Sequence, residues 1–402
     1  MGSSAIDWHS LDSIANDVGD AFYVYDEPAL QRDIEDITHA VTAVLENVRF
    51  HYAYKANPTP DICRVIARFG WGAEVDSPML LWLARRIGVP AADIAYNGIA
   101  RDPASLREAL LAGALVILDA DRDVNAALQA ARESGPAPLR VAIRLHSATD
   151  ITPMPRLGRT REQVREAIDA LTSEPGIALL GLTVHRPDRS HEGVRARLRD
   201  VIEASTEFFP NGPQIIGVGG SLIPRMSPLT SGYATSAEII RAELEAVPWG
   251  SRVMVLMEPG TSAVANAFGF VARVVDVKRQ PDRTVINVAG SINHTSPNKR
   301  RVDFPLHVIS PSERRRVPGL RLVGGASAID GDWLSVDMPC DAEVRPGDFL
   351  VFNGIGAYSI SMGTHFSEPL PAVVQHDAEG WHVLRRRPTF AETFAGFDLG
   401  TM

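Results

Sequence analysis

The sequence predicts an α/β fold, a (β/α)8 barrel of the TIM type with a C-terminal all-β domain, and two observations predict it. Between residues 25 and 265, short apolar runs alternate with longer amphipathic segments. After residue 265 the pattern changes to short strands of alternating polarity, broken by Pro, Gly, Asn and Asp. A chain of 402 residues is too long for one ordinary core. We therefore expect a barrel over residues 25–265 and a β domain formed by residues 1–24 and 266–402.

The apolar runs correspond to the expected barrel strands. In the segments between them, for example 161–171 and 194–208, apolar residues recur at steps of three and four, as a helix packed on a sheet requires. Strands joined in this way run parallel. The expected barrel strands are 48–54, 72–75, 93–96, 115–118, 140–145, 177–185, 214–218 and 253–257. Expected strands of the β domain include 270–277, 284–288, 334–336 and 349–352.

The composition favours a cytoplasmic protein that acts on a small molecule. A net charge of -9 leaves no basic surface for nucleic acid or anionic lipid. The two cysteines, Cys63 and Cys340, lie far apart in the sequence, so neither a disulfide framework nor a cysteine metal site is indicated, and we expect no metal. The first residues lack the features of a signal peptide or a myristoylation site, and no apolar run is long enough to span a membrane.

Lys55 stands at the end of the first run, where a barrel of this kind carries its catalytic groups. In an extended strand Lys55 shares a face with His51 and Ala53, opposite the aromatic residues Phe50 and Tyr52. Burial there disfavours the charged form of the amine, and imine formation needs the neutral form. The alternative is a lysine that extends into solvent at the barrel rim.

Two further strand ends offer groups for a planar, phosphorylated ligand. The seventh run ends in a glycine-rich turn, where the backbone N–H groups around Gly217, Gly219, Gly220 and Ser221 would cradle a phosphate. The alternative is a tight turn with no ligand. The sixth run ends at His185, whose ring can stack on a planar ligand, although a lone histidine is more often an interior residue.

Acidic residues follow the second and the eighth run. The second ends in EVDS, which includes Asp76, and the eighth leads into Glu258, Gly260 and Thr261. A carboxylate such as Glu258 held against a ring nitrogen would keep that nitrogen protonated, while the alternative is an ordinary glutamate solvated at the rim. Together, the strand ends predict a site for a phosphorylated aromatic aldehyde that is bound through Lys55.

In this order, the motifs resemble those of the fold-type III pyridoxal-phosphate enzymes, the group with diaminopimelate, ornithine and arginine decarboxylases and, more distantly, alanine racemase. YAYKAN (52–57) resembles the Schiff-base motif, GAEVDS (72–77) the second-strand motif and EPG (258–260) the ring-nitrogen motif, and the resemblance covers nearly the whole chain. It implies pyridoxal 5'-phosphate on Lys55, stacking by His185 and phosphate binding at 217–221. It also implies cofactor contacts by Asp76, Glu258, Gly260 and Thr261.

Two late motifs favour the decarboxylase branch of this group. MPCD (338–341) resembles the cysteine motif that one subunit contributes to the active site of the other, and NGIGAY (353–358) resembles the segment whose tyrosine, here Tyr358, binds the cofactor phosphate. Racemases of the group generally lack this pair. The resemblance implies a homodimer with shared active sites and makes Cys340 a proton donor. The alternative for Cys340 is a small buried residue in a β-strand.

The function that the resemblance predicts is decarboxylation of an amino acid. Glu258 would keep the ring nitrogen of the cofactor protonated, and Cys340 or Lys55 would protonate the α-carbon after CO2 leaves. Racemisation, elimination or an aldol-type cleavage are alternatives, because the cofactor and the fold support all of them. A relative that binds the cofactor without catalysis is a further alternative, and the retained motif residues argue against it.

Several positions depart from the common decarboxylase pattern around the cofactor phosphate. Thr261 stands where the family commonly has arginine, and the segment 186–188 replaces Gly-Ser after the stacking histidine. The hydroxyl groups of Ser221, Thr261 or Ser262 would compensate as donors. We therefore expect rearranged phosphate contacts.

The two expected substrate contacts predict opposite charges on the distal group of the substrate. In the stretch NKRRVDF, Arg300 would bind a distal carboxylate of the substrate. Phe304, however, stands where diaminopimelate decarboxylases have tyrosine. The alternative for the basic residues 299–301 is an ordinary turn exposed to solvent. Asp341 would instead bind a distal ammonium group. We expect a decarboxylase that acts on a modified amino acid in specialised metabolism, and favour this over ordinary lysine biosynthesis.

Overall fold

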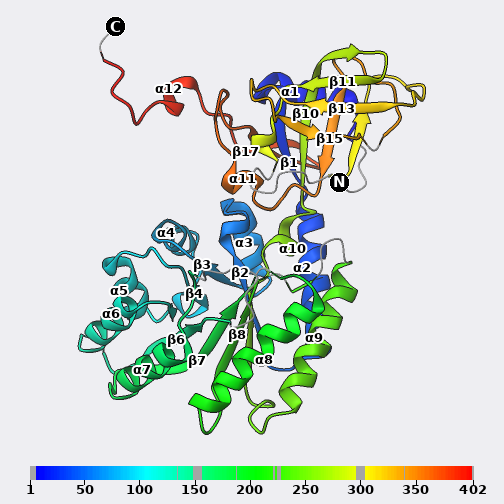
Figure 1. Ribbon diagram of the computed structural model, residues 1–402. Coiled ribbons are helices and arrows are strands. Elements are labelled where there is room, and N and C mark those ends of the chain that lie inside the picture. Colours follow the sequence, from blue (N-terminus) through cyan, green and yellow to red (C-terminus); the bar gives the residue numbers. More distant parts are fainter. Residues whose placement is uncertain are drawn as a thin grey trace. The chain divides into compact units, whose positions relative to one another are not determined.

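The computed structural model divides the chain into two compact units (Figure 1). The barrel unit is Asp33–Ala263, and the β unit combines Met1–Arg32 with Val264–Met402. The structure describes residues 6–133, 135–147, 156–186, 188–220, 222–223, 228–295, 304–338 and 340–400. Within these ranges, no helix is long and apolar enough to cross a membrane.

The barrel unit is built on eight parallel strands that form a closed ring, in which β2 pairs with β3 on one side and with β9 on the other. Helices alternate with the strands (Figure 1). The strands are β2 (Val48–Ala53), β3 (Gly72–Val75), β4 (Ile94–Tyr96), β5 (Leu115–Leu118), β6 (Leu139–Leu145), β7 (Ile177–His185), β8 (Ile215–Gly219) and β9 (Met254–Met257). The helices are α2 (Glu27–Thr42), α3 (Pro60–Arg68), α4 (Pro78–Arg86), α5 (Pro103–Leu111), α6 (Asp121–Ala131), α7 (Arg161–Thr172), α8 (His191–Phe208) and α9 (Leu229–Glu245), with 3-10 turns η1 (Tyr54–Ala56) and η2 (Ala91–Asp93).

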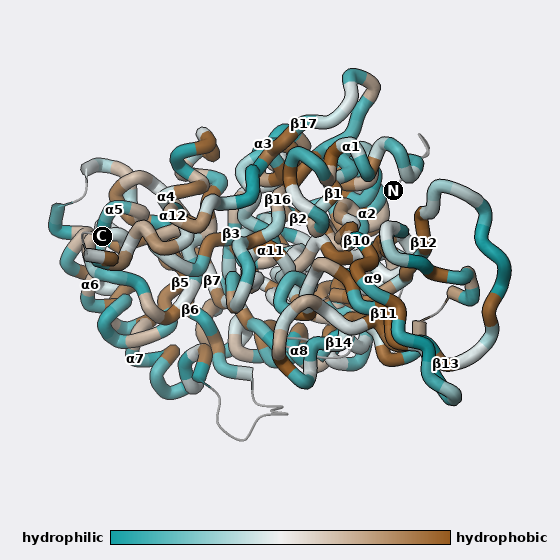
Figure 2. Tube along the Cα trace, turned by 90° about the horizontal axis from the view of Figure 1, so that it is seen from above, coloured by the Kyte–Doolittle hydropathy of each residue, from teal (hydrophilic) through white to brown (hydrophobic). Residues whose placement is uncertain are grey.

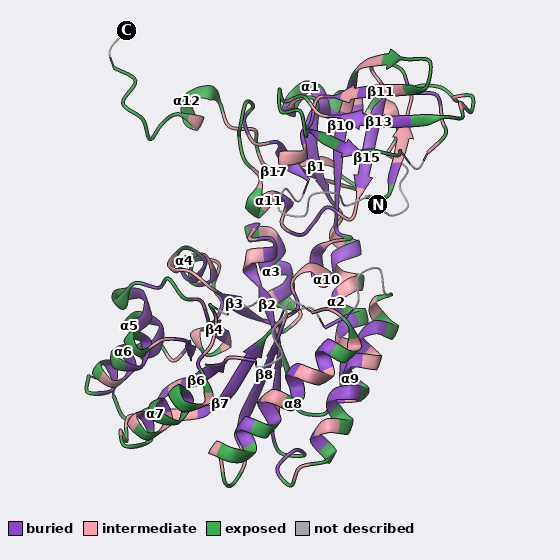
Figure 3. Ribbon diagram, viewed as in Figure 1, coloured by how far each residue is buried: buried purple, intermediate pink, exposed green. Residues whose placement is uncertain are grey.

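Burial on both faces explains why the barrel strands have nearly continuous apolar sequences. Every residue of β3, β4, β5 and β8 is buried, and Figure 3 shows β3 and β8 in purple. Full burial of one aliphatic side chain contributes about 1.5–3 kcal/mol, so such clusters stabilise the ring. One core cluster joins five neighbouring strands through Leu115, Ile117, Ala142, Leu180, Ile215 and Leu256.

Side-chain caps start the helices directly after the strands. Ser77 Oγ accepts a hydrogen bond from the backbone N–H of Leu80 at the start of α4, at 3.3 Å, and Asp102 Oδ1 accepts one from the N–H of Ser105 at the start of α5, at 2.9 Å. Such a cap typically contributes about 1 kcal/mol. Because every strand runs in the same direction, the turns from strand to helix all lie at one end of the barrel.

The fold predicted from the sequence is confirmed. All eight expected barrel strands occur, and each end lies within one residue of the predicted end. One local difference concerns the first strand, which ends at Ala53 because Tyr54 begins the turn η1. Lys55 therefore lies in a 3-10 turn and not on the strand itself.

The β unit is a mixed sheet to which both ends of the chain contribute. Strand β1 lies between β10, its antiparallel neighbour, and β16, its parallel neighbour. The order is β14-β13-β11-β10-β1-β16-β17, and β15 pairs with β10 and β12. The strands are β1 (Ala21–Tyr25), β10 (Phe268–Arg279), β11 (Arg283–Val288), β12 (Leu306–Ile309), β13 (Leu320–Gly324), β14 (Trp333–Ser335), β15 (Phe349–Asn353), β16 (Ala372–Asp377) and β17 (Gly380–Arg385). The short helices are α1 (Trp8–Val18), α10 (Thr261–Val264), η3 (Ile292–His294), α11 (Ser359–Met362) and α12 (Phe390–Thr393).

The β unit has a hydrophobic core of its own. Leu11 and Ile14 of α1 belong to one buried cluster with Phe22 of β1, Val271 of β10 and Val351 of β15. Figure 2 shows β10 largely in brown, the colour of hydrophobic residues. This core is independent of the barrel, which is consistent with two domains that each bury their own apolar surface.

Candidate active site

The strand ends of the barrel unit bring one set of polar side chains together. Lys55 follows β2, Glu74 lies in β3 and Asp76 directly after it, His185 is the last residue of β7, and Glu258 follows β9. Glu74 and Asp76 are ion-pair partners of Lys55, and its positive charge acts on both His185 and Glu258. The barrel therefore gathers residues that lie up to two hundred positions apart in the sequence.

Lys55 is the centre of this set. Its Nζ forms a short ion pair and hydrogen bond with Glu74 Oε2, and lies 4.0 Å from Asp76 Oδ2. The Lys55 side chain is 31% exposed, whereas that of Glu74 is 1% exposed. The amine therefore contacts a buried carboxylate, while part of the lysine side chain stays accessible to solvent.

The charge state of Lys55 differs from the expectation drawn from the sequence. Burial alone lowers its pKa, but the carboxylates of Glu74, Glu258 and Asp76 outweigh burial and hold the pKa above its ordinary value. The expected neutral amine is thus an ammonium in the absence of cofactor. Reaction with an aldehyde requires that its proton first pass to an acceptor, and Glu74, which is already hydrogen bonded to Nζ, is the nearest one.

Glu74 and Arg144 are functional candidates that the sequence analysis missed. Glu74 lies inside a four-residue strand that is otherwise apolar and wholly buried. A single charged residue within such an apolar run was the sequence signal that could have identified it. Arg144 lies within β6, is buried, and its Nη1 lies 3.2 Å from Asp119 Oδ2. Charged residues inside buried strands are rare unless they are paired or functional.

His185 is held in its neutral form. The residue keeps an exposed face, but protein groups surround its ring on most sides, and this loss of water, followed by the positive charges of Lys55, Arg144 and Arg197, lowers its pKa to about 3. The imidazole is therefore uncharged throughout the physiological range. A neutral flat ring is suited to stack on another ring.

Glu258 is a carboxyl with an unusually high pKa. Burial, followed by the negative charge of the nearby Glu74, raises the pKa of Glu258 to about 7 against the opposing charges of Lys55 and Arg144. Glu258 therefore gains and releases a proton near neutral pH. Perturbed carboxyls of this kind concentrate at functional sites.

Glycine at position 219 makes room for this arrangement. A Cβ atom placed on Gly219 would lie 2.7 Å from Glu258 Oε2 and 2.9 Å from His185 Nδ1, which is closer than contact distance. Gly220 has φ +90°, and a Cβ there would lie 2.1 Å from the carbonyl oxygen of Arg186. Glycine at position 219 therefore lets the Glu258 carboxyl and the His185 ring approach the end of β8 closely, and Gly220 has a backbone conformation that other residues rarely adopt.

We expect Gly219→Ala to reduce turnover about 100-fold while the protein still folds. The added methyl group displaces the ends of two side chains, Glu258 and His185, and no backbone atom blocks it closer than 3.3 Å. Gly135→Ala is the matched control, since a Cβ at Gly135 meets nothing within 4 Å. Thermal melting checks that both variants fold, and steady-state kinetics measure their turnover. Unchanged turnover in Gly219→Ala would contradict the placement of the site.

The other residues that were expected to contact the cofactor phosphate each have different neighbours. Gly217 lies inside β8 against the side chain of Thr183, with a Cβ position 2.6 Å from Thr183 Cγ2. Gly260 packs against Ala53 and Ala56, and Thr261 begins α10. The hydroxyl of Ser262 is hydrogen bonded to the Tyr233 hydroxyl, at 2.6 Å. Ser221 lies outside the described residues.

Three expected site residues belong to the β unit. Cys340 is half-buried, and the exposed Asp341 pairs with Arg316 at 3.6 Å. Tyr358 has φ 63° and precedes α11, and among the described residues it is the one non-glycine residue with a positive φ. Such a conformation costs of order 1–3 kcal/mol and is most common at functional sites. Arg300 lies outside the described residues.

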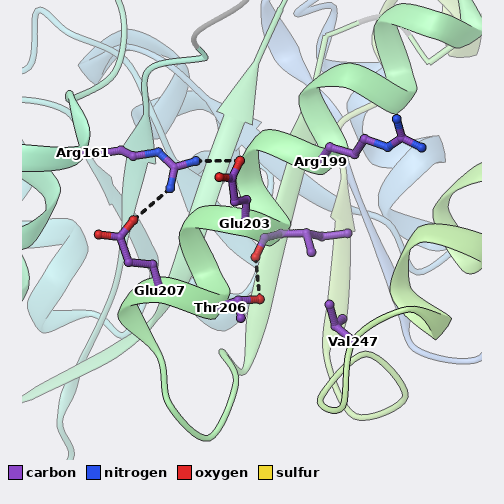
Figure 4. Close-up of a pocket in the computed structure, with 7 residues that line it drawn as sticks. Arg161, Arg199, Glu203, Thr206, Glu207 and Val247 are labelled. Carbon is purple, nitrogen blue, oxygen red and sulfur yellow. Dashed lines mark hydrogen bonds and ion pairs between the residues drawn. The ribbon is translucent and has the colours of Figure 1, made fainter.

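A hollow of about 560 Å³ on the barrel unit offers no competing site (Figure 4). It lies between α7, α8 and the chain after α9, beside Thr206 and Val247. Arg161 lies 3.1 Å from Glu203 and 2.9 Å from Glu207, so these charged groups neutralise one another. Surface pairs of this kind are usually structural and contribute little.

A parallel eight-stranded barrel with a lysine, a histidine and carboxylates at its strand ends, joined to a β-sheet domain, defines the class of fold-type III pyridoxal-phosphate enzymes. The sequence profile of the family described as "Pyridoxal-dependent decarboxylase, pyridoxal binding domain" matches residues 31–265. The chain belongs to this family. Pyridoxal phosphate is therefore its cofactor, and the members of the family are amino-acid decarboxylases that depend on it.

Comparison with known proteins finds relatives along nearly the whole chain. The diaminopimelate decarboxylase of Deinococcus radiodurans is 28% identical, over 96% of this chain and 98% of the relative. That of Aquifex aeolicus is 22% identical, over 97% and 94%. A crystal structure of the Methanocaldococcus jannaschii enzyme in complex with L-lysine has a TM-score of 0.82 at 20% identity, over 96% of this chain and 93% of that one. The chain is a distant homologue of diaminopimelate decarboxylases.

The residues of the barrel unit fit this cofactor. The carboxyl of Glu258 and the neutral ring of His185 both lie against Gly219 at the end of β8, and a carboxyl suits a basic ring nitrogen as a neutral ring suits the face of a pyridine. Glu74 Oε1 is buried and has no hydrogen-bond partner within the described ranges, so it can accept a further hydrogen bond. Lys55 supplies the primary amine to which an aldehyde can attach.

Proposed function

We propose that the protein removes the α-carboxylate of an amino acid, with pyridoxal phosphate held at Lys55, and that its substrate differs from diaminopimelate at the distal end. The cluster of Lys55, Glu74, Asp76, His185 and Glu258 carries this proposal. When bound, the cofactor supplies an aldehyde for the substrate amine and an electron sink for the bond that breaks. The protein residues position these groups and control protons.

Each side chain of the cluster has one task. Lys55 holds the cofactor, and Glu74 accepts the proton that Nζ must release. Glu258, with a pKa near 7, holds a proton at the ring nitrogen. His185 covers one ring face as a neutral imidazole. We assign Asp76, 4.0 Å from Nζ and partly accessible, to the side of the site where the substrate enters.

The distal end of the substrate is where this chain departs from its relatives. Phe304 lacks the hydroxyl that diaminopimelate decarboxylases provide, and Asp341 carries a negative charge that favours an ammonium group. The relatives named above decarboxylate diaminopimelate, whose distal end has both charges. A modified amino acid of specialised metabolism would account for altered recognition beside retained cofactor chemistry.

A panel of amino acids with capture of CO2 tests the proposal. The panel contains diaminopimelate, ornithine, arginine, lysine and forms of these acids modified on the distal group, and products are analysed for chirality and mass. CO2 with the matching amine from one acid would establish the function. Racemised acid or an elimination product without CO2 would replace decarboxylation by another reaction of the same cofactor.

We further propose a homodimer in which Cys340 and Asp341 of one subunit complete the site of the other. Cys340 would then donate the proton to the α-carbon. In this arrangement the barrel unit of one chain would supply Lys55 and the β unit of the other would supply Cys340.

A mixture of two inactive variants tests shared sites. Lys55→Ala and Cys340→Ala, mixed in equal amounts and allowed to exchange subunits, should recover roughly a quarter of wild-type turnover, because half of the dimers then carry one intact site. The double variant in a single chain, mixed with itself, is the control. No recovery after confirmed subunit exchange would place both residues of a site in one chain.

A further inference from the structure

Arg144 and Asp119 form a buried ion pair in the barrel unit that none of the roles above uses. Arg144 Nη1 lies 3.2 Å from Asp119 Oδ2, and the two side chains are only 6% and 5% exposed. Removing both charges from water is costly, and well-packed apolar residues would often stabilise a barrel as well as such a pair does. The pair therefore calls for a functional explanation.

The direction of these side chains follows from the core of the barrel. Asp119 is the first residue after β5, Arg144 lies in β6, and Glu258 is the first residue after β9. Each of the three comes two positions after a member of the buried cluster that joins five strands. These members are Ile117, Ala142 and Leu256. Since positions i and i+2 of a strand share a face, the three charged side chains form the next layer on that face, toward the strand ends.

The pairing of β6 with β7 places Arg144 on the same face as His185. Arg144 is in register with Thr183, which lies two positions before His185. Residues in register on parallel strands point to the same side of the sheet, and so do positions i and i+2. The positive charge of Arg144 accordingly acts on His185, Asp76 and Glu258. Arg144 therefore belongs to the polar cluster of the candidate active site.

Asp119 is fixed in place by contacts of its own. Its Oδ1 accepts a hydrogen bond from the backbone N–H of Gly158, at 2.6 Å, and its own backbone N–H donates one to Asp123 Oδ2, at 3.0 Å. Asp123 in turn pairs with the buried Arg101, at 2.8 Å. Within the described part of the chain, Asp119 is the one acid that pairs with Arg144. It thus provides a rigid anchor for the guanidinium.

We propose that Asp119 is a positioning residue, which holds the Arg144 guanidinium at the strand ends as the second cation of the site after Lys55. The inference rests on the role proposed above for Glu258 at the ring nitrogen. Burial and the charge of Glu74 oppose the ionisation of Glu258, whereas Lys55 and Arg144 favour it. If Arg144 were displaced, more Glu258 would be protonated at neutral pH, and a protonated carboxyl has no negative charge for the ring nitrogen.

Direct titration of Glu258 in the cofactor-free protein tests this role. NMR of 13C-labelled glutamate carboxyls follows the ionisation, and Glu258→Gln identifies the signal. We expect Arg144→Gln to raise the pKa of Glu258 by roughly one pH unit, and Asp119→Asn to raise it in the same direction. Asparagine can still accept the hydrogen bond from Gly158, but it has no charge to hold Arg144.

The sign of the shift separates positioning from a direct charge effect. Loss of the negative charge of Asp119, with Arg144 still in place, would lower the pKa of Glu258. A lowered or unchanged pKa in Asp119→Asn would therefore overturn the proposal. Asp119→Glu is a second variant, which keeps the charge but moves the carboxylate. It should also raise the pKa of Glu258, and an unchanged value there would contradict positioning.

Two further variants complete the experiment. Asp121→Asn is the matched control, because Asp121 is 79% exposed and pairs with a different arginine, Arg159, at 2.5 Å. It should leave the pKa of Glu258 unchanged. Asp119→Asn combined with Arg144→Gln should match Arg144→Gln alone, and a further shift would show that Asp119 acts independently of Arg144 and contradict the proposal.

Failure of this inference is distinguishable from failure of the proposed function. The titration requires neither cofactor nor substrate, so an unchanged pKa of Glu258 in Asp119→Asn would leave the release of CO2 by wild type unaffected. The absence of CO2 from wild type that binds cofactor would instead overturn decarboxylation and leave the result for Asp119 standing.

Discussion

Lys55→Ala is expected to reduce turnover by at least roughly 10³-fold and to remove the visible absorbance of the bound cofactor. Without the amine, the aldehyde of the cofactor has no attachment point. No amine at that position can then exchange with the amine of the substrate. Rates with the identified acid and a visible spectrum measure both effects. Lys278→Ala is the matched control, because this lysine is 64% exposed and belongs to the β unit.

The same substitution removes the cation that compensates Glu74. A buried carboxylate without its partner destabilises the fold by about 3–5 kcal/mol, so Lys55→Ala should melt at a lower temperature than wild type. Lys55→Ala combined with Glu74→Gln removes that charge and should recover most of the lost stability without recovering turnover. Full turnover and retained absorbance in a folded Lys55→Ala would remove Lys55 from the site.

Glu258→Gln is expected to lower turnover by about 10²- to 10³-fold while the cofactor remains bound. The amide has nearly the same shape as the carboxylate, but it has no negative charge that would keep the ring nitrogen of the cofactor protonated. The electron sink is therefore weakened. Glu245→Gln is the control, because Glu245 is 62% exposed and pairs only with Arg241 at 2.8 Å among the contacts described. A variant Glu258→Gln with wild-type rates would exclude a contact with the ring nitrogen.

The pH dependence of stability provides a check on Glu258 without cofactor. The pKa rises from the ordinary 4.5 to about 7 in the folded protein, so ionisation opposes folding. This cost is absent below pH 4.5, grows between 4.5 and about 7, and is complete above 7. Cofactor-free Glu258→Gln should therefore gain melting temperature relative to wild type as pH rises from 5 to 8, and a gain that shrinks over this range would contradict the assignment.

The barrel could be predicted from the sequence because its physics is local. A parallel strand buried on both faces must be apolar along most of its length, so each strand appears as a nearly continuous apolar run between amphipathic helices. The ends matched within one residue since polar turns follow directly. Where the prediction differed, at Lys55, the chain had already turned at Tyr54 into η1, which alternation along the strand does not reveal.

The barrel side of the candidate site was predictable only in part. The rule that catalytic groups follow barrel strands identified Lys55, His185 and Glu258, and the barrel brings Lys55 close enough for its charge to act on the other two. The pairing of Lys55 with Glu74 was not predictable, because it depends on the neighbouring strand, and it reverses the expected shift in the pKa of Lys55.

The roles of Cys340, Asp341 and Tyr358 stay predictions that rest on the late motifs. Tyr358 combines a positive φ with a place directly before α11, and this strain supports a functional reason for its conformation. The subunit-mixing experiment addresses Cys340 directly.

Chemical fixation of the cofactor tests the central claim most directly. The lysines of this chain are Lys55, Lys278 and Lys299, so peptide mapping after borohydride reduction can distinguish every possible attachment point. We predict a visible absorbance band that reduction abolishes, with the reduced cofactor recovered on the peptide that contains Lys55. Recovery on Lys278 or Lys299, or no band after addition of pyridoxal phosphate, would contradict the assignment of Lys55 as the residue that holds the cofactor.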